Sequence, residues 1–540
     1  MLIKKPSLTV IYFFLSALSG IAILFPYMNF QFLFATGDHG RDLYGFYRTL
    51  LGDAPYRDYW WVYGPLMPYY YASVFALLGV TAKSIILGKL FLQWVCGLVF
   101  FLSVNLWLSS AMAFLATLWF WVYQPDFFFT YNHIGGVLAL TGIIGIVLAY
   151  IKKPDTRLIC LGFVLCVILA LVKLNIGLST LLAMALSLGA NDKIHQRLSK
   201  ERKIFYFKCL LAAAAAIGTI YFLFLRGLPW HYLRQCFPYL EADHQYTSSI
   251  GHALTIYLNT LFAHIGESLP NLLFAAIIIF SGLKISIAIF QKQSAMQLKK
   301  DTLSISLAFV FFTILNLHEF LNSGVFYRTF WVDTFKIFFM FFLIDAGIRN
   351  FSFVPRLLLM IALLSVITID TSNRNQMIRS YKTPAHYLPY DNAKIFIGNS
   401  PEWIDTVRKT TDYLTSTLSP HETFLAAPYD PIYYYLTKRQ SPSRYLIFFD
   451  HINVHPSQEK ELITLLENKN VNYVVLSSRM SAREIGLGTF GETYCPLLAD
   501  YITKNFKVAT VFGDWQNDPG WAWNHGTKIL RRIQVRSASQ

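Results

Sequence analysis

The sequence predicts a polytopic α-helical membrane protein that ends in a soluble α/β domain. Apolar residues make up 55% of the 540 residues and charged residues only 14%, and the mean hydropathy is +0.42, a composition that soluble globular proteins do not share. Long apolar runs recur as far as residue 370, after which the composition turns polar. We therefore expect a transmembrane domain in residues 1–370 and a soluble domain in residues 371–540, which is long enough to bury a core.

Twelve apolar runs are candidates for membrane spans, and several are shorter than the ~20 residues that cross a bilayer upright. The runs cover residues 8–34, 67–80, 84–106, 108–123, 134–151, 158–172, 174–189, 208–226, 268–290, 303–317, 331–348 and 356–369. The net charge of +15 is concentrated in short loops between these runs. Such a distribution is typical of the orientation signal of a membrane protein, so we expect no nucleic-acid partner.

The positive-inside rule orients the chain across the inner (plasma) membrane. Lys4 and Lys5 precede the first run, which we interpret as a retained span with a cytoplasmic N-terminus. Basic residues also mark four loops as cytoplasmic, namely 152–157, 191–208, 292–300 and 349–356. The segments left outside are 124–133, 173–175, 227–267, 318–330 and everything after 370. This alternation requires an odd number of crossings, 11 or 13, so one boundary among the runs must be wrong.

Segment 36–68 follows the first apolar run and is dense in charged and aromatic side chains. Charged groups cost free energy in hydrocarbon and aromatic rings prefer the interface, so this segment is expected at the membrane surface. Asp38 and Asp42 are four residues apart and share one face if the segment is helical. An ordinary amphipathic loop beside the membrane has the same composition, and composition alone does not separate the two interpretations.

An acidic residue just after the first span, a short helix, Pro-Tyr-Arg-Asp at 55–58 and Gly-Pro at 64–65 together resemble the GT-C glycosyltransferases. The pattern is similar to bacterial members of glycosyltransferase family 39, which resemble protein O-mannosyltransferases and lipid A aminoarabinose transferases and take a sugar from a polyprenyl-phosphate carrier. This resemblance favours 13 spans and implies that Asp38 is the catalytic aspartate. The family usually has Asp-Glu where this chain has Asp38-His39, and Asp42 is the nearest substitute for the second acid.

Polar residues recur in other segments that we place outside. Asp126 and His133 fall where GT-C relatives often have a second acidic or polar active-site residue, and an aromatic interface belt is the alternative. Lys173 and Asn175 interrupt apolar sequence in a pattern that resembles the Lys-x-Asn/Pro-x-Gly turn of family 39. A fixed ammonium there can pair with a lipid phosphate, although a lone lysine at a helix end can also snorkel to the interface.

His318, Glu319 and Arg328 lie within eleven positions of one another in a further outside segment. The guanidinium of Arg328 offers a bidentate fork to a phosphate, whereas His318 can equally be an interfacial histidine bonded to the backbone. Loop 227–267 either lines the acceptor entrance or is simply solvated. The candidate substrate-binding residues are Arg41, Asp58, Asp126, His133, Lys173, Asn175, His318, Glu319 and Arg328.

Helices and strands alternate in residues 371–540, which is typical of a small α/β layer domain. Helices are expected at 401–418, 431–437, 458–468 and 497–505, and strands at 423–427, 472–477, 506–512 and 528–535. Residues 433–448 resemble the Leu-Tyr-x-Leu-Thr-x-Arg-x-x-Pro-x-Arg-Tyr stretch of the C-terminal domains of bacterial family 39. This second match is independent of the first, and the region has neither a Gly-rich phosphate loop nor a nucleophile elbow.

The residues and the resemblance predict a hexosyl- or pentosyltransferase that moves a sugar from a polyprenyl-phosphate donor to a lipid, glycan or protein acceptor at the outer face of the inner membrane. Asp38 is expected to act as general base and Asp42 to orient a substrate, while Lys173 and Arg328 stabilise the departing phosphate. No obligatory metal or other cofactor is expected, although some GT-C relatives bind divalent cations. The alternatives are a transporter or flippase for a lipid-linked glycan and a non-catalytic scaffold, and no internal repeat of the transporter kind is visible.

Overall fold

The computed structural model describes residues 8–29, 38–123, 131–237, 250–263, 300–324, 326–348, 351–381, 388–392, 401–448, 454–478, 488–515 and 526–533. Over these residues the chain is mostly helical, and it divides into two compact units. The helical unit consists of Met1–Pro26, Lys89–Ile220 and Ser248–Gln376. The mixed unit consists of Tyr27–Gly88, Tyr221–Thr247 and Met377–Gln540 and carries the four strands of a sheet.

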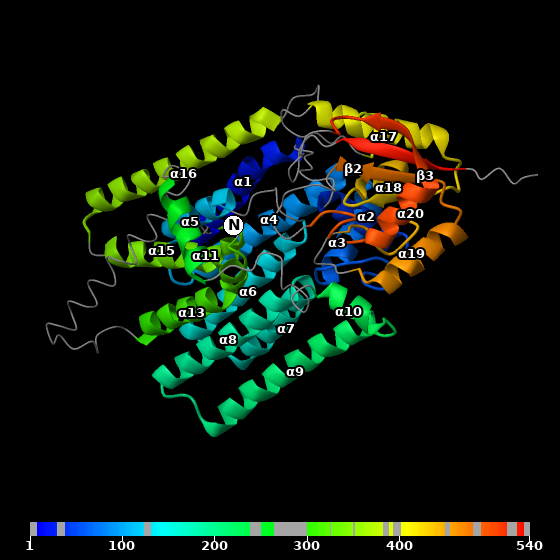
Figure 1. Ribbon diagram of the computed structural model, residues 1–540. Helices are drawn as coiled ribbons and strands as arrows, with labels where there is room; N and C mark the ends of the chain where they lie inside the picture. The colour runs from blue at the N-terminus through cyan, green and yellow to red at the C-terminus, as the bar shows by residue number, and fades with distance from the viewer. Residues whose placement is uncertain are drawn as a thin grey trace, which may run out of the picture. The chain divides into compact units, whose positions relative to one another are not determined.

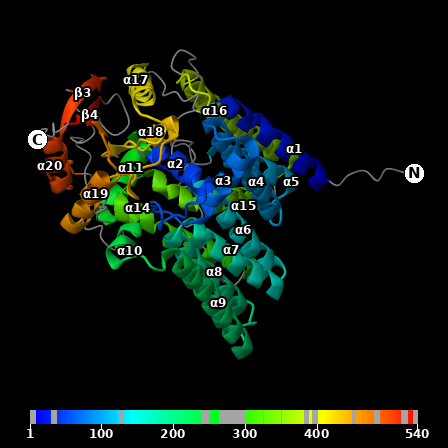
Figure 2. The ribbon, with the colours of Figure 1, turned by 90° about the vertical axis from the view of Figure 1, so that its right-hand side faces the viewer.

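Most of the apolar runs form helices of the helical unit, because a run that is apolar on every side can bury its backbone polar groups only by bonding them internally. The helices that lie wholly or largely in this unit are α1 (Leu8–Leu24), α4 (Ala82–Val104), α5 (Ser110–Tyr123), α6 (His133–Lys152), α7 (Thr156–Val172), α8 (Leu174–Ile194), α9 (Lys200–Leu225), α11 (Ile250–Ala263), α13 (Lys300–Asn316), α14 (His318–Ser323), η4 (Phe326–Val332), α15 (Asp333–Ile348) and α16 (Phe353–Tyr381). Helices α6, α7 and α8 pack side by side (Figures 1 and 2), and α13 lies along α8 (Figure 1).

Among the described residues, six helical segments are long and apolar enough to cross a membrane. They are Leu8–Tyr27, Ala82–Val104, His133–Lys152, Leu174–Ile194, Lys200–Leu225 and Lys300–Ser323. Shorter apolar helices cover Leu66–Leu78, Ser110–Val122, Thr156–Val172 and Phe353–Ile369. Large apolar side chains such as Phe207 and Phe222 of α9 are more than half exposed, which suits contact with lipid. The predicted run 268–290 lies outside the described residues, and the total of 11 or 13 spans stays a prediction.

The connection between α7 and α8 is a single residue, and it brings a lysine to the junction of two helices. Lys173 has an extended backbone, which ends α7 and starts α8. The two helices then pack closely, because a Cβ added to Gly177 would lie 2.3 Å from the Cα of Ala170. Only a residue without a side chain allows this approach, so Gly177 sets how α8 runs back along α7.

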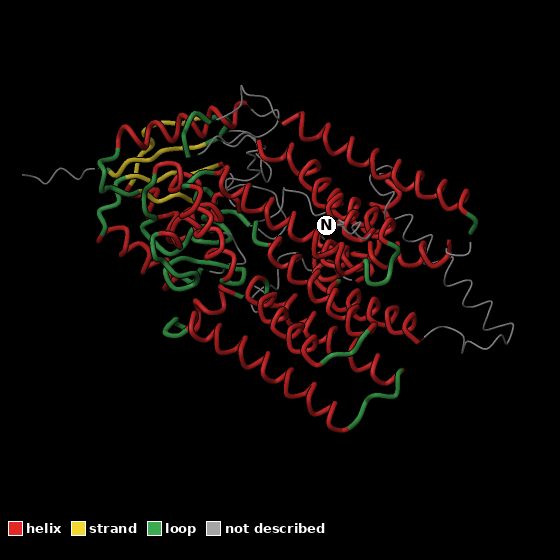
Figure 3. The backbone as a smooth tube through the Cα atoms, turned by 180° about the vertical axis from the view of Figure 1, so that it is seen from behind, coloured by secondary structure: helices red, strands yellow, loops and turns green. Residues whose placement is uncertain are grey.

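The mixed unit combines three α-helices of the N-terminal half with the C-terminal helices and strands. Its helices are α2 (Asp38–Leu50), α3 (Leu66–Leu78), α10 (Trp230–Cys236), α17 (Pro401–Thr417), α18 (Ile432–Thr437), α19 (Pro456–Asn468) and α20 (Pro496–Asn505). Its strands are β1 (Phe424–Ala427), β2 (Tyr473–Ser477), β3 (Phe506–Phe512) and β4 (Thr527–Arg532). They form one sheet in the order β1-β2-β4-β3, and Figure 3 draws the strands in yellow. β1 and β2 are parallel, whereas β4 runs antiparallel to both of its neighbours.

The core of the mixed unit extends from the sheet to the loop that follows α2. β1 and β2 are buried along their whole length, and they pack with Leu462 and Leu466 of α19 and Leu498 of α20. Trp60, from the loop between α2 and α3, is 1% exposed and belongs to the same apolar cluster. Its indole donates to the backbone oxygen of Gln235 at 2.9 Å. The loop after the first span is therefore built into the mixed unit.

The helices and strands expected in the C-terminal region lie within three residues of their observed bounds. Short apolar strands and amphipathic helices separated by polar turns leave little freedom in such assignments. The contact that the sequence does not predict is the one between segment 27–88 and the C-terminal region. The domain boundary at 370 and the solubility of residues 371–540 remain predictions.

Candidate functional site

The two predicted catalytic carboxylates lie at the start of α2 and share one arginine. Arg41 donates from Nη1 to Oδ1 of Asp38 at 2.9 Å, and from Nε and Nη2 to Oδ1 of Asp42 at 3.0 and 2.8 Å. Arg41 and Asp42 are buried, whereas the side chain of Asp38 is 29% exposed. Asp38 lies in the first described turn of α2, where the helix dipole favours a carboxylate. We call these three residues the carboxylate cluster.

Aromatic rings surround the shared arginine. Its guanidinium carbon lies 5.6 Å from the ring centre of Trp61 and 5.2 Å from that of Tyr63. Burial acts to lower the pKa of Arg41, but Asp42 and Asp38 act against it and raise that pKa above its usual value. Arg41 therefore stays charged and serves as a fixed counter-ion for both carboxylates.

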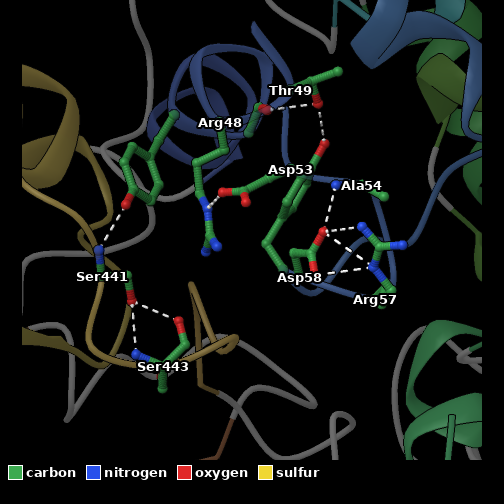
Figure 4. Close-up of polar contacts among 11 residues, drawn as sticks. Arg48, Thr49, Asp53, Ala54, Arg57, Asp58, Ser441 and Ser443 are labelled. Carbon is green, nitrogen blue, oxygen red and sulfur yellow. Dashed lines mark hydrogen bonds and ion pairs between the residues drawn. The ribbon is translucent and has the colours of Figure 1, made fainter. Parts of the chain in front are cut away.

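The remaining acids of the loop after α2 hold the turn together. Arg48 donates to Asp53 at 2.6 Å, and Asp58 accepts from the backbone nitrogen of Ala54 at 2.7 Å and from the exposed Arg57 at 2.8 Å (Figure 4). The hydrogen bond from Arg57 lowers the pKa of Asp58. The structure thus gives Asp58 a place in the loop turn, and its predicted contact with substrate stays a prediction.

A tyrosine from the C-terminal region reaches the carboxylate cluster. Tyr429 is buried, and its hydroxyl donates to Oδ1 of Asp38 at 2.7 Å. None of the family resemblances found in the sequence includes Tyr429. A sequence signal does exist, because Tyr429-Asp430 stands between two prolines directly after a buried strand, and strand ends in α/β sheets often carry functional groups.

The second group of predicted residues assembles around Glu319 in the helical unit. The carboxylate is 1% exposed, and its Oε1 accepts from Nζ of Lys173 and from Nδ2 of Asn175, both at 2.7 Å. Its Oε2 accepts from the indole of Trp331 at 3.0 Å. A buried carboxylate is stable when it is paired and fully hydrogen-bonded, and these three donors meet that need. Trp331 was not predicted from the sequence.

Two histidines and an arginine lie around the ion pair of Lys173 and Glu319. His133 begins α6, and its Nε2 is 3.4 Å from Nζ of Lys173. His318 has one ring nitrogen 2.8 Å from the backbone oxygen of Leu315 and the other 2.9 Å from Nδ2 of Asn175. The backbone contact expected for an interfacial histidine is therefore present, together with a contact inside the cluster. Arg328 is close enough to act electrostatically on Lys173 and Glu319.

We call this group the lysine cluster, and it joins residues that are far apart in sequence. Its members are His133, Lys173, Asn175, His318, Glu319, Arg328 and Trp331. The cations Lys173 and Arg328, taken with the anion Glu319, carry one net positive charge when both histidines are neutral. Such a group can bind a phosphate ester. Asp126, the substrate-binding candidate predicted from the same segment as His133, lies outside the described residues.

Within the described part of the chain, no group of three or more His, Cys, Asp or Glu residues is placed to hold a metal ion. The carboxylate cluster supplies two acids and the lysine cluster one acid with two histidines, and in both an amino or guanidinium group stands against the carboxylates. Independence from metal remains a prediction.

No protein-family model and no curated protein matches this chain. Solved structures do match it, over almost its whole length. ArnT from Cupriavidus metallidurans bound to undecaprenyl phosphate has a TM-score of 0.55 at 10% identity, covering 98% of this chain and 99% of that one. The same protein in the apo state has a TM-score of 0.53 at 10% identity, covering 96% and 97%. An oligosaccharyltransferase from Archaeoglobus fulgidus, tethered with an acceptor peptide, has a TM-score of 0.51 at 12% identity, covering 88% and 69%.

Both neighbours are membrane glycosyltransferases of the GT-C superfamily. The chain has the GT-C fold. The resemblance found in the loop after the first span and in residues 433–448 is confirmed at the level of the fold. Within this GT-C fold, the carboxylate cluster belongs to the mixed unit and the lysine cluster to the helical unit. The roles of individual residues rest on the chemistry of these two clusters.

Proposed function

We propose that this chain is a membrane glycosyltransferase that moves a sugar from a polyprenyl-phosphate carrier to an acceptor at the outer face of the inner membrane. The observation that carries this proposal is the match over 98% of the chain to a glycosyltransferase bound to undecaprenyl phosphate. The assembled lysine cluster supports it, because a cationic group is what a lipid phosphate requires. The donor sugar, a hexose or a pentose, is left open.

The transfer is an inverting displacement at the anomeric carbon. The acceptor oxygen forms the new bond to this carbon while the bond to the phosphate oxygen breaks, and the electron pair leaves with the phosphate. Asp38 takes the proton of the acceptor hydroxyl as general base. Asp38 is suited to this role because it is partly exposed and carries its charge beside a permanently charged arginine. Asp42 is buried and fixes the position of Arg41.

Lys173 and Arg328 neutralise the leaving phosphate in this proposal. A phosphodiester donor carries one negative charge and gains a second as the sugar departs, and the net charge of +1 on the lysine cluster fits that change. Lys173 is 13% exposed and is already held by Glu319. A cation fixed in this way spends little free energy on reorganisation when the donor binds.

Two of the structural neighbours suggest which acceptors to test. One structural neighbour carries a peptide with an acceptor sequon, and the other is bound to a lipid phosphate. Peptides and lipids are therefore the acceptors to test first, followed by glycans. Comparing outer-envelope lipids and glycoproteins by mass spectrometry, with and without the gene, identifies the acceptor and the sugar together.

The decisive experiment compares Asp38→Asn with Asp42→Asn in purified protein. Transfer of labelled mannose, glucose or aminoarabinose from synthetic undecaprenyl phosphate to peptide and lipid acceptors is the measurement. We expect Asp38→Asn to lose transfer by a factor on the order of 10² or more with the same yield of folded protein, and Asp42→Asn to lose less. A transporter, flippase or scaffold needs no base, so normal biological activity of Asp38→Asn in cells contradicts the proposal.

A further inference from the structure

The C-terminal region supplies a side chain to the carboxylate cluster, and this contact suggests a role for the region in the reaction. The hydroxyl of Tyr429 and the guanidinium of Arg41 both donate to Oδ1 of Asp38, at 2.7 and 2.9 Å. The tyrosine is 4% exposed and lies between β1 and α18. Two donors at defined positions orient a carboxylate far better than one donor does.

Tyr429 is itself held in place by the sheet. It belongs to the apolar cluster that contains Leu425 of β1 and Tyr445. Just before it, the backbone oxygen of Pro428 accepts from the nitrogen of Phe448 at 2.7 Å. The backbone nitrogen of Ala426 donates to the hydroxyl of Tyr434 at 2.8 Å. The hydroxyl of Tyr429 is therefore carried on a rigid support, as a positioning group requires.

One face of α2 is fitted to α18, which follows Tyr429 directly. A Cβ added to Gly40 would lie 2.8 Å from the backbone nitrogen of Ile432, so the two helices approach as closely as a glycine allows. One turn later, the hydroxyl of Tyr44 accepts from the backbone nitrogen of Ser441 at 2.6 Å. Tyr47, at the next step along the same face, packs edge-on against Tyr435. This docking fixes the register of α2 and with it the position of Asp38.

We infer that Tyr429 is a positioning residue for the base Asp38, so that the C-terminal region completes the catalytic carboxylate site. The role depends on the function proposed above. Tyr429 orients the carboxylate toward the acceptor hydroxyl and stabilises its charge, and Arg41 does the same from α2. The ionisable groups that surround Arg41 at this point are Asp38, Asp42, Tyr63 and Tyr429. Truncating the C-terminal region therefore removes part of the site itself.

The test is the pair Tyr429→Phe and Tyr433→Phe in the full-length protein. Tyr433 is the matched control, because it lies on the same segment, is equally buried, and its hydroxyl pairs with Thr527 at 3.2 Å instead of with a carboxylate. We expect Tyr429→Phe to lower kcat about tenfold with little change in the donor KM, and Tyr433→Phe to stay within about twofold of the parent. Melting temperatures of the two variants should agree, which excludes a purely structural effect.

The pH profile is the second readout. Losing a donor to the carboxylate disfavours its ionised form, so the acid limb of kcat/KM should move to higher pH in Tyr429→Phe and stay in place in Tyr433→Phe. Transfer by Tyr429→Phe with the parent kcat and pH profile, while Asp38→Asn is inactive, overturns the role of Tyr429 and leaves the proposed function intact. Absence of transfer by the parent protein with every synthetic donor overturns the proposed function instead.

Discussion

Helix α8 connects two buried carboxylate networks of different chemistry. At its first turn, Asn175 and the preceding Lys173 bind Glu319. Near its last turn, Asp192 is 0% exposed, accepts from the hydroxyl of Tyr206 at 2.5 Å and forms an ion pair with Arg202 at 2.8 Å. Asn175 and Asp192 are 17 positions apart, about 25 Å at the ~1.5 Å rise of a helix, which is close to the thickness of the hydrocarbon core.

The difference between the two networks indicates which of them is built for chemistry. Asp192 is bonded by two tyrosines and an arginine, and Arg202 also donates to the hydroxyl of Tyr150 at 2.7 Å. Such a closed set of phenols joins the ends of α6, α8 and α9 and stabilises their packing. The Glu319 network instead contains a lysine, an amide and two histidines, whose nitrogen-bound protons can be donated to an anionic substrate. We therefore expect substrate at the Glu319 end and structural support at the Asp192 end.

The first prediction concerns the sides of the membrane on which the two ends of α8 lie. The basic segment 191–208 assigns the Asp192 end to the cytoplasm, so the Lys173 end and the C-terminus should lie outside. An alkaline phosphatase fused after Gln540 should be active in cells and a fluorescent protein active only in the cytoplasm should be dark. The reverse pattern overturns the orientation and the proposed site of transfer together.

The second prediction concerns Lys173. Lys173→Met removes a charged hydrogen-bond donor, worth roughly 1.5–3 kcal/mol, so kcat/KM should fall about tenfold to a hundredfold, mainly through the donor KM. The same change leaves Glu319 buried without its cation and should lower the melting temperature. Donor titrations of the transfer rate, with thermal melts of the purified protein, separate the two effects.

Two control variants separate a loss of donor binding from a loss of stability. Lys173→Met combined with Glu319→Gln removes the buried uncompensated charge, so stability should recover while the donor KM stays high. Lys336 of α15 is also buried and pairs with Asp333, so Lys336→Met should lower stability without changing the donor KM. If the double variant regains normal donor affinity, Lys173 only snorkels, and the phosphate-binding role is wrong.

The third prediction tests the other end of the helix. Asp192→Asn leaves Arg202 without its anion, but that side chain is 26% exposed and can turn toward solvent, so the cost should be about 1–3 kcal/mol. We expect a lower melting temperature and unchanged kcat and KM per folded molecule. A loss of transfer without a loss of stability contradicts the division of labour between the two ends.

The two ends of α8 also show which features of the site could be predicted from the sequence. Lys173, Asn175, His318 and Glu319 were predicted as substrate-binding residues from two separate outside segments, and the structure brings them together. Asp192 was assigned to a cytoplasmic loop, whereas it is buried in α8. A charge at the end of an apolar run looks solvated unless its partners are known.

Local sequence patterns do not reveal hydrogen-bond partners that lie far away in the sequence. Tyr150 meets Asp192 from 42 positions away, and Tyr429 meets Asp38 from 391 positions away. Tyrosine and tryptophan are also common at membrane interfaces, so residue type alone does not single out Tyr429 or Trp331 in this chain. Local periodicity specifies the helices and strands, but the pairing of polar groups depends on tertiary packing that no local pattern encodes.

The smallest expected effects come from two glycines of α8. Gly177 lies near the Lys173 end, and a Cβ there would meet the backbone of Ala170 at 2.3 Å, whereas a Cβ on Gly189, near the other end, would have no atom within 4 Å. Gly177→Ala should therefore force α8 away from α7, cost about 1–3 kcal/mol and lower kcat/KM a few-fold by moving Lys173. Gly189→Ala should stabilise the helix by about 0.5–1 kcal/mol and leave transfer unchanged. Thermal melts and donor titrations of the transfer rate measure both effects. Equal effects of the two substitutions would show that the packing at the Lys173 end of α8 is no more restrictive than the packing at its other end.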